Sequence, residues 1–189
     1  MRKCTILLNS DLECLAKKLK TADDDQNANA AVAVILSRED DDFSVLLVKR
    51  VDNLGDPWSG QIGLPGGKRE TKDENLHQCV VRETLEETGI DLARGRLLGL
   101  LPALRSIPRP DLMIVPFAVF FEHEPAVILN HKELESFVWI PLEQIAESRS
   151  IVKIGVRETP AFVVGETVIW GLTFRIPESY IEIIKNLST

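Results

Sequence analysis

The feature that most limits what this chain can fold into is a double glycine followed by a run dense in carboxylates. Gly66-Gly67 leads into a charged loop, and the run Arg82–Gly89 has the character of a helix end closed by glycine. Side chains three and four positions apart share one helix face, so Glu83, Glu86 and Glu87 converge. Such carboxylates repel one another unless a cation lies among them, and Mg²⁺ prefers oxygen ligands that it shares with substrate phosphates. The pattern therefore predicts a divalent-metal site for phosphate chemistry.

Around this helix the sequence predicts a mixed α/β domain. Asp73 is the expected N-cap of a helix from about Glu74 to Thr88, which Gly89 closes. Apolar, β-rich runs predict six strands, at residues 30–36, 43–48, 97–101, 113–121, 136–140 and 167–172. Further helices are expected at residues 12–19, 141–145 and 177–186. Since no repeat, linker or low-complexity segment is visible, the 189 residues are expected to form one domain.

The overall charge and the cysteines narrow the class of protein. A formal net charge of −7 argues against a nucleic-acid scaffold, because phosphate backbones are bound by an excess of Lys and Arg. A small phosphorylated substrate needs only a local cluster of positive groups. Cys4, Cys14 and Cys79 show no metal-type spacing, which favours a reducing compartment. With neither a secretory signal nor a membrane-spanning run in view, we expect a cytoplasmic protein, either a monomer or a homodimer.

The glycine turn and the carboxylate run together resemble the Nudix box, Gly-x5-Glu-x7-Arg-Glu-U-x-Glu-Glu-x-Gly-U, in which U is a bulky apolar residue. The segment Arg82–Ile90 matches its second half, except that Thr84 stands where an apolar residue is usual. Glu74 stands eight residues before Arg82, as the pattern requires, but Gly67 stands seven before Glu74 instead of six. We place the extra residue in the loop, because an insertion within a helix would rotate the catalytic face. The alternative alignment puts Asp73 in the glutamate position.

This resemblance implies the Nudix fold, a mixed β-sheet sandwiched between α-helices, in a single domain of residues 1–189 with the box at about 67–90. It implies hydrolysis of a small-molecule diphosphate with Mg²⁺ or Mn²⁺ as cofactor. By position in the motif, the implied metal ligands are Glu83, Glu86, Glu87 and the backbone carbonyl of Gly67, and Arg82 orients them. The metal would neutralise the pyrophosphate and lower the pKa of the attacking water, while Glu83 would take a proton from that water.

Residues outside the box complete the predicted site. Glu133 occupies a loop that in many Nudix enzymes supplies a further catalytic or metal-binding glutamate. Arg50, Lys68, Arg105 and Arg109 are expected to contact substrate phosphates, and the arginine fork suits oxyanions. For each of these five residues the alternative interpretation is a solvated surface charge.

The segments that flank the box resemble the coenzyme A pyrophosphatase branch of the family. The similarity lies in Val45–Arg50, in Trp58–Gly67 and in the Trp-Gly-Leu-Thr element within Val168–Thr173. Val51-Asp52 and Leu64 depart from the usual residues of that branch. The expected substrate is therefore coenzyme A or its acyl derivatives. ADP-ribose or a nucleoside triphosphate is the alternative substrate, and a non-catalytic nucleotide-binding Nudix module is the alternative function.

Overall fold

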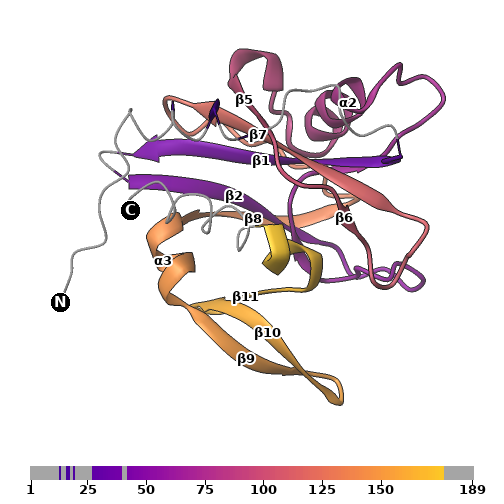
Figure 1. Ribbon diagram of the computed structural model, residues 1–189. Coiled ribbons are helices and arrows are strands. Elements are labelled where there is room, and N and C mark those ends of the chain that lie inside the picture. The colour runs from indigo at the N-terminus through magenta and orange to yellow at the C-terminus, as the bar shows by residue number, and fades with distance from the viewer. Residues whose placement is uncertain (1–12, 14–15, 18, 20–26, 40–41, 177–189) are drawn as a thin grey trace.

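The computed structural model describes residues 13, 16, 17, 19, 27–39 and 42–176, and a mixed β-sheet forms its centre (Figure 1). The expected helix at 177–186 and most of that at 12–19 lie outside the described residues. The main sheet contains Ala30–Glu39 (β1), Asp42–Arg50 (β2), Ile62–Gly63 (β3), Gly66–Lys68 (β4), Arg96–Leu100 (β5), Leu104–Arg105 (β6), Met113–Phe121 (β7) and Leu134–Pro141 (β8). A smaller sheet contains Arg149–Ile154 (β9), Arg157–Val164 (β10) and Thr167–Trp170 (β11). The helices are Leu76–Thr88 (α2), Leu142–Glu147 (α3) and the 3-10 turn Leu92–Arg94 (η1).

The two longest neighbouring strands, β1 and β2, pair only near their hairpin and then separate. Their antiparallel register runs from Glu39↔Asp42 to Leu36↔Val45. Beyond that point β2 pairs with β3 and β1 pairs with β4, so these two short strands fill the gap between the diverging strands. Gly66 lies in this gap with a φ of +136°, and a Cβ on it would come within 2.3 Å of the Ala31 carbonyl oxygen. Glycine is therefore required where the chain presses against β1.

Helices and strands form layers on both faces of the main sheet. In Figure 1, α2 lies over one face, while α3 and the smaller sheet lie on the opposite side. Because side chains alternate along a strand, the sheet contributes to two apolar cores. The core on the α2 side includes Ile35, Leu46, Cys79, Val80 and Phe117, all at most 1% exposed. The core on the α3 side includes Leu36, Val45, Leu47, Ile145 and Ile169, also at most 1% exposed.

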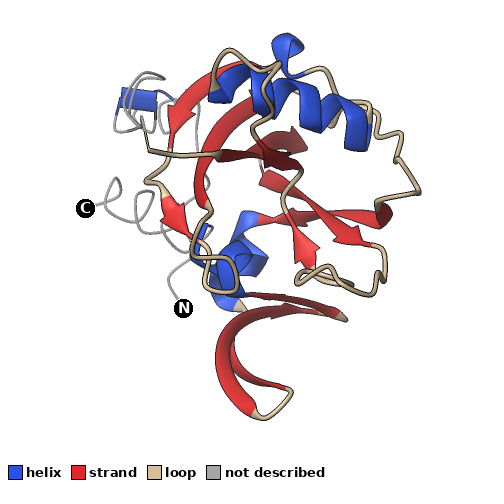
Figure 2. Ribbon diagram, turned by 90° about the vertical axis from the view of Figure 1, so that its right-hand side faces the viewer, coloured by secondary structure: helices blue, strands red, loops and turns tan. Residues whose placement is uncertain are grey.

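The expected mixed sheet between helices is confirmed, as an α+β arrangement. All six predicted strands are present, and the strand at 113–121 has the predicted bounds. β11 ends at Trp170 rather than at residue 172, because Gly171 has a φ of +65° and residues 171–176 are helical. The sequence did not predict β9 and β10, which form a hairpin that projects from the body of the protein (Figure 2).

The start of α2 is a correction. The helix begins at Leu76, not near Glu74, and its N-cap is Asn75, whose side chain accepts a hydrogen bond from the Gln78 N–H at 2.9 Å. Asp73 is not the N-cap. Gly89 ends the helix as predicted, with a φ of +69°.

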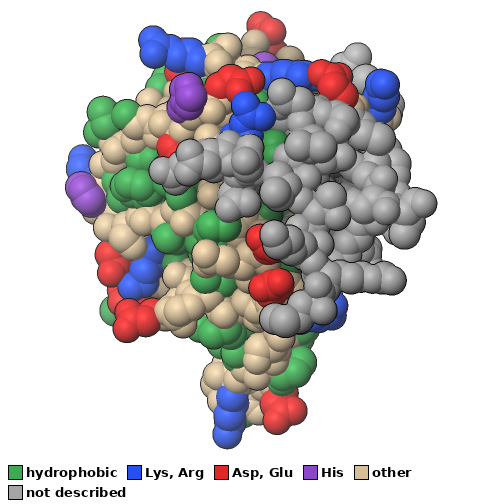
Figure 3. Space-filling model, turned by 90° about the vertical axis from the view of Figure 1, so that its left-hand side faces the viewer, with side chains coloured by type: hydrophobic (Ala, Val, Ile, Leu, Met, Phe, Trp, Pro, Cys, Tyr) green, Lys and Arg blue, Asp and Glu red, His purple; other side chains and the backbone are tan. Residues whose placement is uncertain are grey.

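Charged side chains of both signs share the surface. On the uncovered part of the face in Figure 3, Lys and Arg side chains lie among Asp and Glu side chains without a broad field of one sign. No helix in the described part of the chain is long and apolar enough to cross a membrane.

Candidate active site

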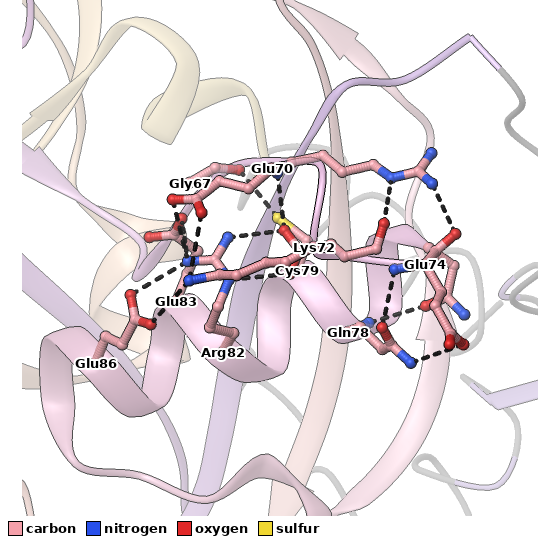
Figure 4. Close-up of polar contacts among 12 residues, drawn as sticks. Gly67, Glu70, Lys72, Glu74, Gln78, Cys79, Arg82, Glu83 and Glu86 are labelled. Atoms are coloured by element: carbon pink, nitrogen blue, oxygen red, sulfur yellow. Dashed lines mark hydrogen bonds and ion pairs between the residues drawn. The ribbon is translucent and has the colours of Figure 1, made fainter.

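Arg82 joins the box loop to the carboxylates of α2. Its Nε and Nη2 donate hydrogen bonds to the two oxygens of Asp73, at 2.9 and 2.8 Å. Its Nη1 donates to Glu83 at 2.8 Å and to Glu86 at 3.2 Å, so one guanidinium serves three acidic side chains (Figure 4). Glu70 lies 3.9 Å from the same Nη1. The Asp73 hydrogen bonds are the main cause that raises the pKa of Arg82, and those bonds hold the pKa of Asp73 far below its usual range.

Of the two candidates for the glutamate position of the box, Asp73 is the one hydrogen-bonded to Arg82, whereas the sequence interpretation favoured Glu74. Glu74 is exposed and exchanges hydrogen bonds with Gln78 instead. Asp73 stands six residues after Gly67, as the motif requires, and nine before Arg82. The extra residue is therefore absorbed in the turn before α2 begins, where it does not rotate the helix face. The sequence argument failed because it started the helix two residues too early.

Glu87 is the most deeply buried carboxylate of α2, with its side chain 3% exposed. Its Oε2 accepts a hydrogen bond from the Gly66 N–H at 2.8 Å, and its Oε1 lies 3.8 Å from Nη1 of Arg50. Burial raises the pKa of Glu87 to about 7, although the hydrogen bond from Gly66 and the charge of Arg50 both act to lower this pKa. Burial also raises the pKa of Glu83, although the bond from Arg82 acts in the opposite direction. Burial at this end of α2 therefore disfavours the charged form of both carboxylates.

Gly67 is the point where β4 touches the helix. A Cβ on Gly67 would come within 2.6 Å of the Glu83 Cδ, so a larger residue would displace this carboxylate. The Gly67 carbonyl accepts a hydrogen bond from the Cys79 thiol at 3.6 Å. Burial raises the pKa of Cys79 to about 12, which keeps the thiol protonated. Cys79 thus belongs to the contact between β4 and α2.

A second loop brings Glu133 to the same carboxylates. The N–H groups of Ile128 and Asn130 donate to the Thr88 and Glu87 carbonyls at 2.8 and 2.9 Å, and so bind two otherwise unpaired carbonyls at the end of α2. The Asn130 side-chain amide donates to Glu133 Oε1 at 2.9 Å. The charge of Glu133 contributes to the raised pKa of both Glu83 and Glu87. The structure thus gathers Glu133 with the predicted box residues.

The chemistry of these side chains fits a hard divalent cation. Glu83, Glu86, Glu87 and Glu133 supply carboxylate oxygens, the donors that Mg²⁺ and Mn²⁺ prefer. As the side chains stand, no three acidic, histidine or cysteine side chains among the described residues are grouped closely enough to hold an ion. Arg82 bonds one oxygen of Glu83 and one oxygen of Glu86, so the second oxygen of each carboxylate is not bonded to the guanidinium.

Arg50 is the predicted substrate-binding residue that the structure places against the carboxylates. Its Nε and Nη2 each lie 2.9 Å from Oδ2 of Asp56, which leaves Nη1 directed toward Glu87. Asp56 was not foreseen, since it lies in an irregular loop without a spacing signal. Lys72, which lies 3.8 Å from Glu86, and Asn130 were also not expected from the sequence.

The other predicted basic residues have different surroundings. Lys68 is exposed at the end of β4, directly after Gly67. Arg105 donates to the Pro110 carbonyl, and Arg109 makes two hydrogen bonds to Asp111, at 3.0 and 2.8 Å. Within the described residues, no hydrogen bond or ion pair joins these two arginines to the carboxylates of α2. Contact of these residues with substrate phosphates stays a prediction.

Known proteins provide an independent comparison. The family model of the NUDIX domain matches residues 27–157. The uncharacterized protein C14C4.10c of Schizosaccharomyces pombe is 34% identical over 139 residues, which cover 61% of this chain and 42% of that protein. The peroxisomal coenzyme A diphosphatase ndx-8 of Caenorhabditis elegans is 31% identical, with 77% of this chain and 62% of that protein covered. The mitochondrial coenzyme A diphosphatase NUDT8 of Homo sapiens is 26% identical, with 83% and 70% covered. The chain thus spans less than two thirds of the first two relatives.

Solved structures share the fold at low sequence identity. A Nudix hydrolase from M. Smegmatis, RenU, has a TM-score of 0.57 at 14% identity and covers 90% of this chain and 95% of its own. The NUDIX domain of Shewanella oneidensis NrtR, complexed with ADP ribose, has a TM-score of 0.54 at 21% identity, with 86% and 88% covered. At these identities the likeness concerns the fold alone.

Proposed function

The chain belongs to the Nudix family, and on this premise we propose that it is a divalent-metal-dependent hydrolase that cleaves the pyrophosphate of a nucleoside diphosphate derivative. The observation that carries the proposal is the excess of carboxylates at the end of α2, where Glu87 is 3% exposed. Buried acids without matching cations are costly to a fold, so such a cluster indicates a cationic ligand.

In this proposal three carboxylates of α2 share the task of holding the metal. Glu83, Glu86 and Glu87 would hold Mg²⁺ or Mn²⁺, together with the Gly67 carbonyl. When bound, the cation supplies neutralisation of the diphosphate charge and a lower pKa for a bound water. Arg82, itself fixed by Asp73, orients Glu83 and Glu86.

We assign proton abstraction to Glu133. Its carboxylate is exposed, and the Asn130 amide fixes one of its oxygens. Glu133 would accept a proton from water as the water oxygen forms a bond to one phosphorus. The anhydride P–O bond then breaks, and the second phosphate leaves with the electron pair. Glu83 is the alternative base, but its carboxylate is already bonded to Arg82 and is one of the groups that would hold the metal.

Coenzyme A or an acyl derivative is the proposed substrate. Two relatives with 31% and 26% identity have names that describe coenzyme A diphosphatases, which supports this choice. The segments Val45–Arg50 and Val168–Thr173 resemble the same branch. The products would be a phosphopantetheine-type compound and adenosine 3′,5′-bisphosphate. ADP-ribose and nucleoside triphosphates are the competing substrates.

The test measures both products from coenzyme A with Mg²⁺, with Mn²⁺ and with a chelator. We expect product only with metal, and a loss of at least about 100-fold in the double variant Glu86→Gln/Glu87→Gln. Glu143→Gln, on the exposed side of α3, is the matched control and should retain activity. Equal hydrolysis by wild type and the double variant would show that the site is misassigned. ADP-ribose and ATP, assayed in parallel, separate the competing substrates.

Cellular location and assembly stay predictions. We propose a single-domain cytoplasmic protein that is a monomer or a homodimer, although the two named relatives are described as peroxisomal and mitochondrial. Fractionation of cells and sedimentation of the purified chain would test the two statements separately.

A further inference from the structure

A cavity of about 510 Å³ lies on the face of the main sheet that is turned away from α2. β2 and β8 contribute Lys49 and Phe137, the segment 59–62 contributes Gln61, and β11 contributes Val168 and Trp170. β11 lies on the same side of the sheet as α3 (Figure 1). The Thr173 hydroxyl donates to the Ile62 carbonyl at 3.0 Å, which holds the chain after β11 against β3. The volume falls in the range of pockets that bind small molecules, roughly 300–1,000 Å³.

The cavity and the carboxylate cluster share the same two chain segments. Lys49 lines the cavity, and the next residue, Arg50, contacts Glu87 from the other face of β2. Ile62 lines the cavity, and Gly66 donates to Glu87. Four residues of extended chain span at most about 14 Å. Ile62 at the cavity and Gly66 at the carboxylates are therefore at most about 14 Å apart, and an arm that joins the two sites would pass around this segment from one face of the sheet to the other.

The walls of the cavity suit an uncharged group better than a phosphate. The Lys49 ammonium lies 2.9 Å from Glu135, so its charge is already paired. Glu166 adds an exposed carboxylate to the lining. Phe137 is 43% exposed, and it and Trp170 make no ring contact with another aromatic residue within the described residues. The cavity therefore combines free apolar walls with hydrogen-bonding side chains and lacks an unpaired cation.

We propose that this cavity binds the uncharged, amide-containing arm of the substrate, the pantetheine-type chain of coenzyme A. The inference rests on the proposed function and specifies which end of the substrate enters. The amide groups would meet polar side chains such as Gln61 and Ser136, while the methylene groups pack on Trp170 and Phe137. The opposite end of coenzyme A carries a 3′-phosphate, which Glu166 would repel. That end therefore lies outside the cavity.

Binding of free pantetheine tests the proposal without chemistry. Added to metal-free protein, pantetheine should change the fluorescence of Trp170, and this response should disappear in Trp170→Phe, while Trp58 and Trp139 remain as internal references. Pantetheine should also compete with coenzyme A in the hydrolysis assay. Pantetheine that neither binds nor competes, in a protein that hydrolyses coenzyme A, would overturn the cavity assignment and leave the proposed function intact.

Variants of the cavity separate its role from that of the metal site. Trp170→Ala should raise KM for coenzyme A by roughly tenfold with little change in kcat, because the lost contact is made equally before and during the reaction. Ser136→Arg fills the cavity from an exposed position of β8 and serves as a second variant that keeps the core intact. Ile151→Ala, on the exposed surface of β9 outside the cavity, is the control and should change neither constant. An unchanged KM in both cavity variants would overturn the inference.

A substrate panel distinguishes the two possible failures. If ADP-ribose is hydrolysed, its KM should not respond to Ser136→Arg, because it has no pantetheine arm. A rise in KM for ADP-ribose that matches the rise for coenzyme A would show that the cavity binds the shared nucleoside end, and would overturn the inference. Absence of coenzyme A hydrolysis in wild type, together with hydrolysis of another diphosphate, would refute the proposed substrate itself.

Discussion

Two arginines of this protein each donate two hydrogen bonds to an aspartate, one in the box region and one in the exposed loop before β7. Arg82 bonds Asp73 at 2.9 and 2.8 Å, and Arg109 bonds Asp111 at 3.0 and 2.8 Å. The second pair is exposed and joins residues two positions apart, so its charges cancel locally. In the first pair Asp73 is buried and Arg82 is partly buried, and the pair joins the box loop to α2. Arg82 is also shared with Glu83 and Glu86. The contrast shows that the same bond geometry closes a single loop in one region and joins two elements of the fold in the other.

Removal of each aspartate is the strongest test of this contrast. Asp73→Ala should lower the free energy of unfolding by about 3 kcal/mol, because it leaves the partly buried Arg82 with fewer partners. Asp111→Ala should leave it almost unchanged, since exposed ion pairs contribute little. Urea unfolding monitored by circular dichroism measures both. Equal losses in the two variants would remove the distinction between the regions.

The pH dependence of the metal-free protein tests the burial of Glu87. The pKa of Glu87 is raised to about 7 from 4.5, so the folded protein binds a proton that the unfolded chain releases between these values. Stability from this group is therefore complete below about pH 4.5 and is lost as pH rises to about 7, by about 3 kcal/mol in total.

Glu87→Gln is the matched variant, because glutamine keeps the shape and cannot ionise. The difference in unfolding free energy between wild type and this variant should fall across pH 4.5–7 and then level off. Asp73 acts in the opposite direction, because its depressed pKa makes its contribution disappear as pH falls below its usual range. A difference that does not depend on pH would contradict the burial argument for Glu87.

Substrate-binding arginines offer a further comparison. Arg50→Ala should lower kcat/KM by about 10- to 100-fold, since it removes a charged hydrogen-bond donor beside the carboxylates. Arg109→Ala should change it by no more than about twofold, because its guanidinium is held by Asp111 in its own loop. Steady-state kinetics with the substrate found to turn over measures both. A larger loss at Arg109 would support the sequence-based prediction that this residue contacts phosphate.

The smallest expected effect lies within α2 itself. The Thr84 hydroxyl is buried without a hydrogen-bond partner among the described residues, at the box position where an apolar residue is usual. Thr84→Val should therefore stabilise the protein by about 1 kcal/mol. Thr88→Val is the control with the opposite sign, because the Thr88 hydroxyl donates to the Thr84 carbonyl at 2.7 Å. Thermal unfolding of the two variants should shift in opposite directions, and a common direction would contradict this assignment.

Sequence reasoning succeeded where a pattern repeats locally. The strand at 113–121 and the glycine end of α2 follow from apolar runs and a single residue type. The short strands β3, β4 and β6 could not be predicted, because they are held in place by their neighbours and not by their own residues. The N-cap was misplaced because Asp73 and Asn75 are both good caps, and the competing partner, Arg82, is nine residues away from Asp73.

The sequence by itself determined that Glu83, Glu86 and Glu87 share one helix face, because the period of an α-helix is a local property. The sequence also determined the Gly66-Gly67 turn, which lets the chain lie close to the carboxylate face of α2. Only the tertiary structure decided that Asp73 holds Arg82, that Asp56 aims Arg50 at Glu87, and that Glu133 joins the cluster. These contacts depend on how the box loop, β2 and the 122–133 loop pack around α2, and no local pattern records that packing.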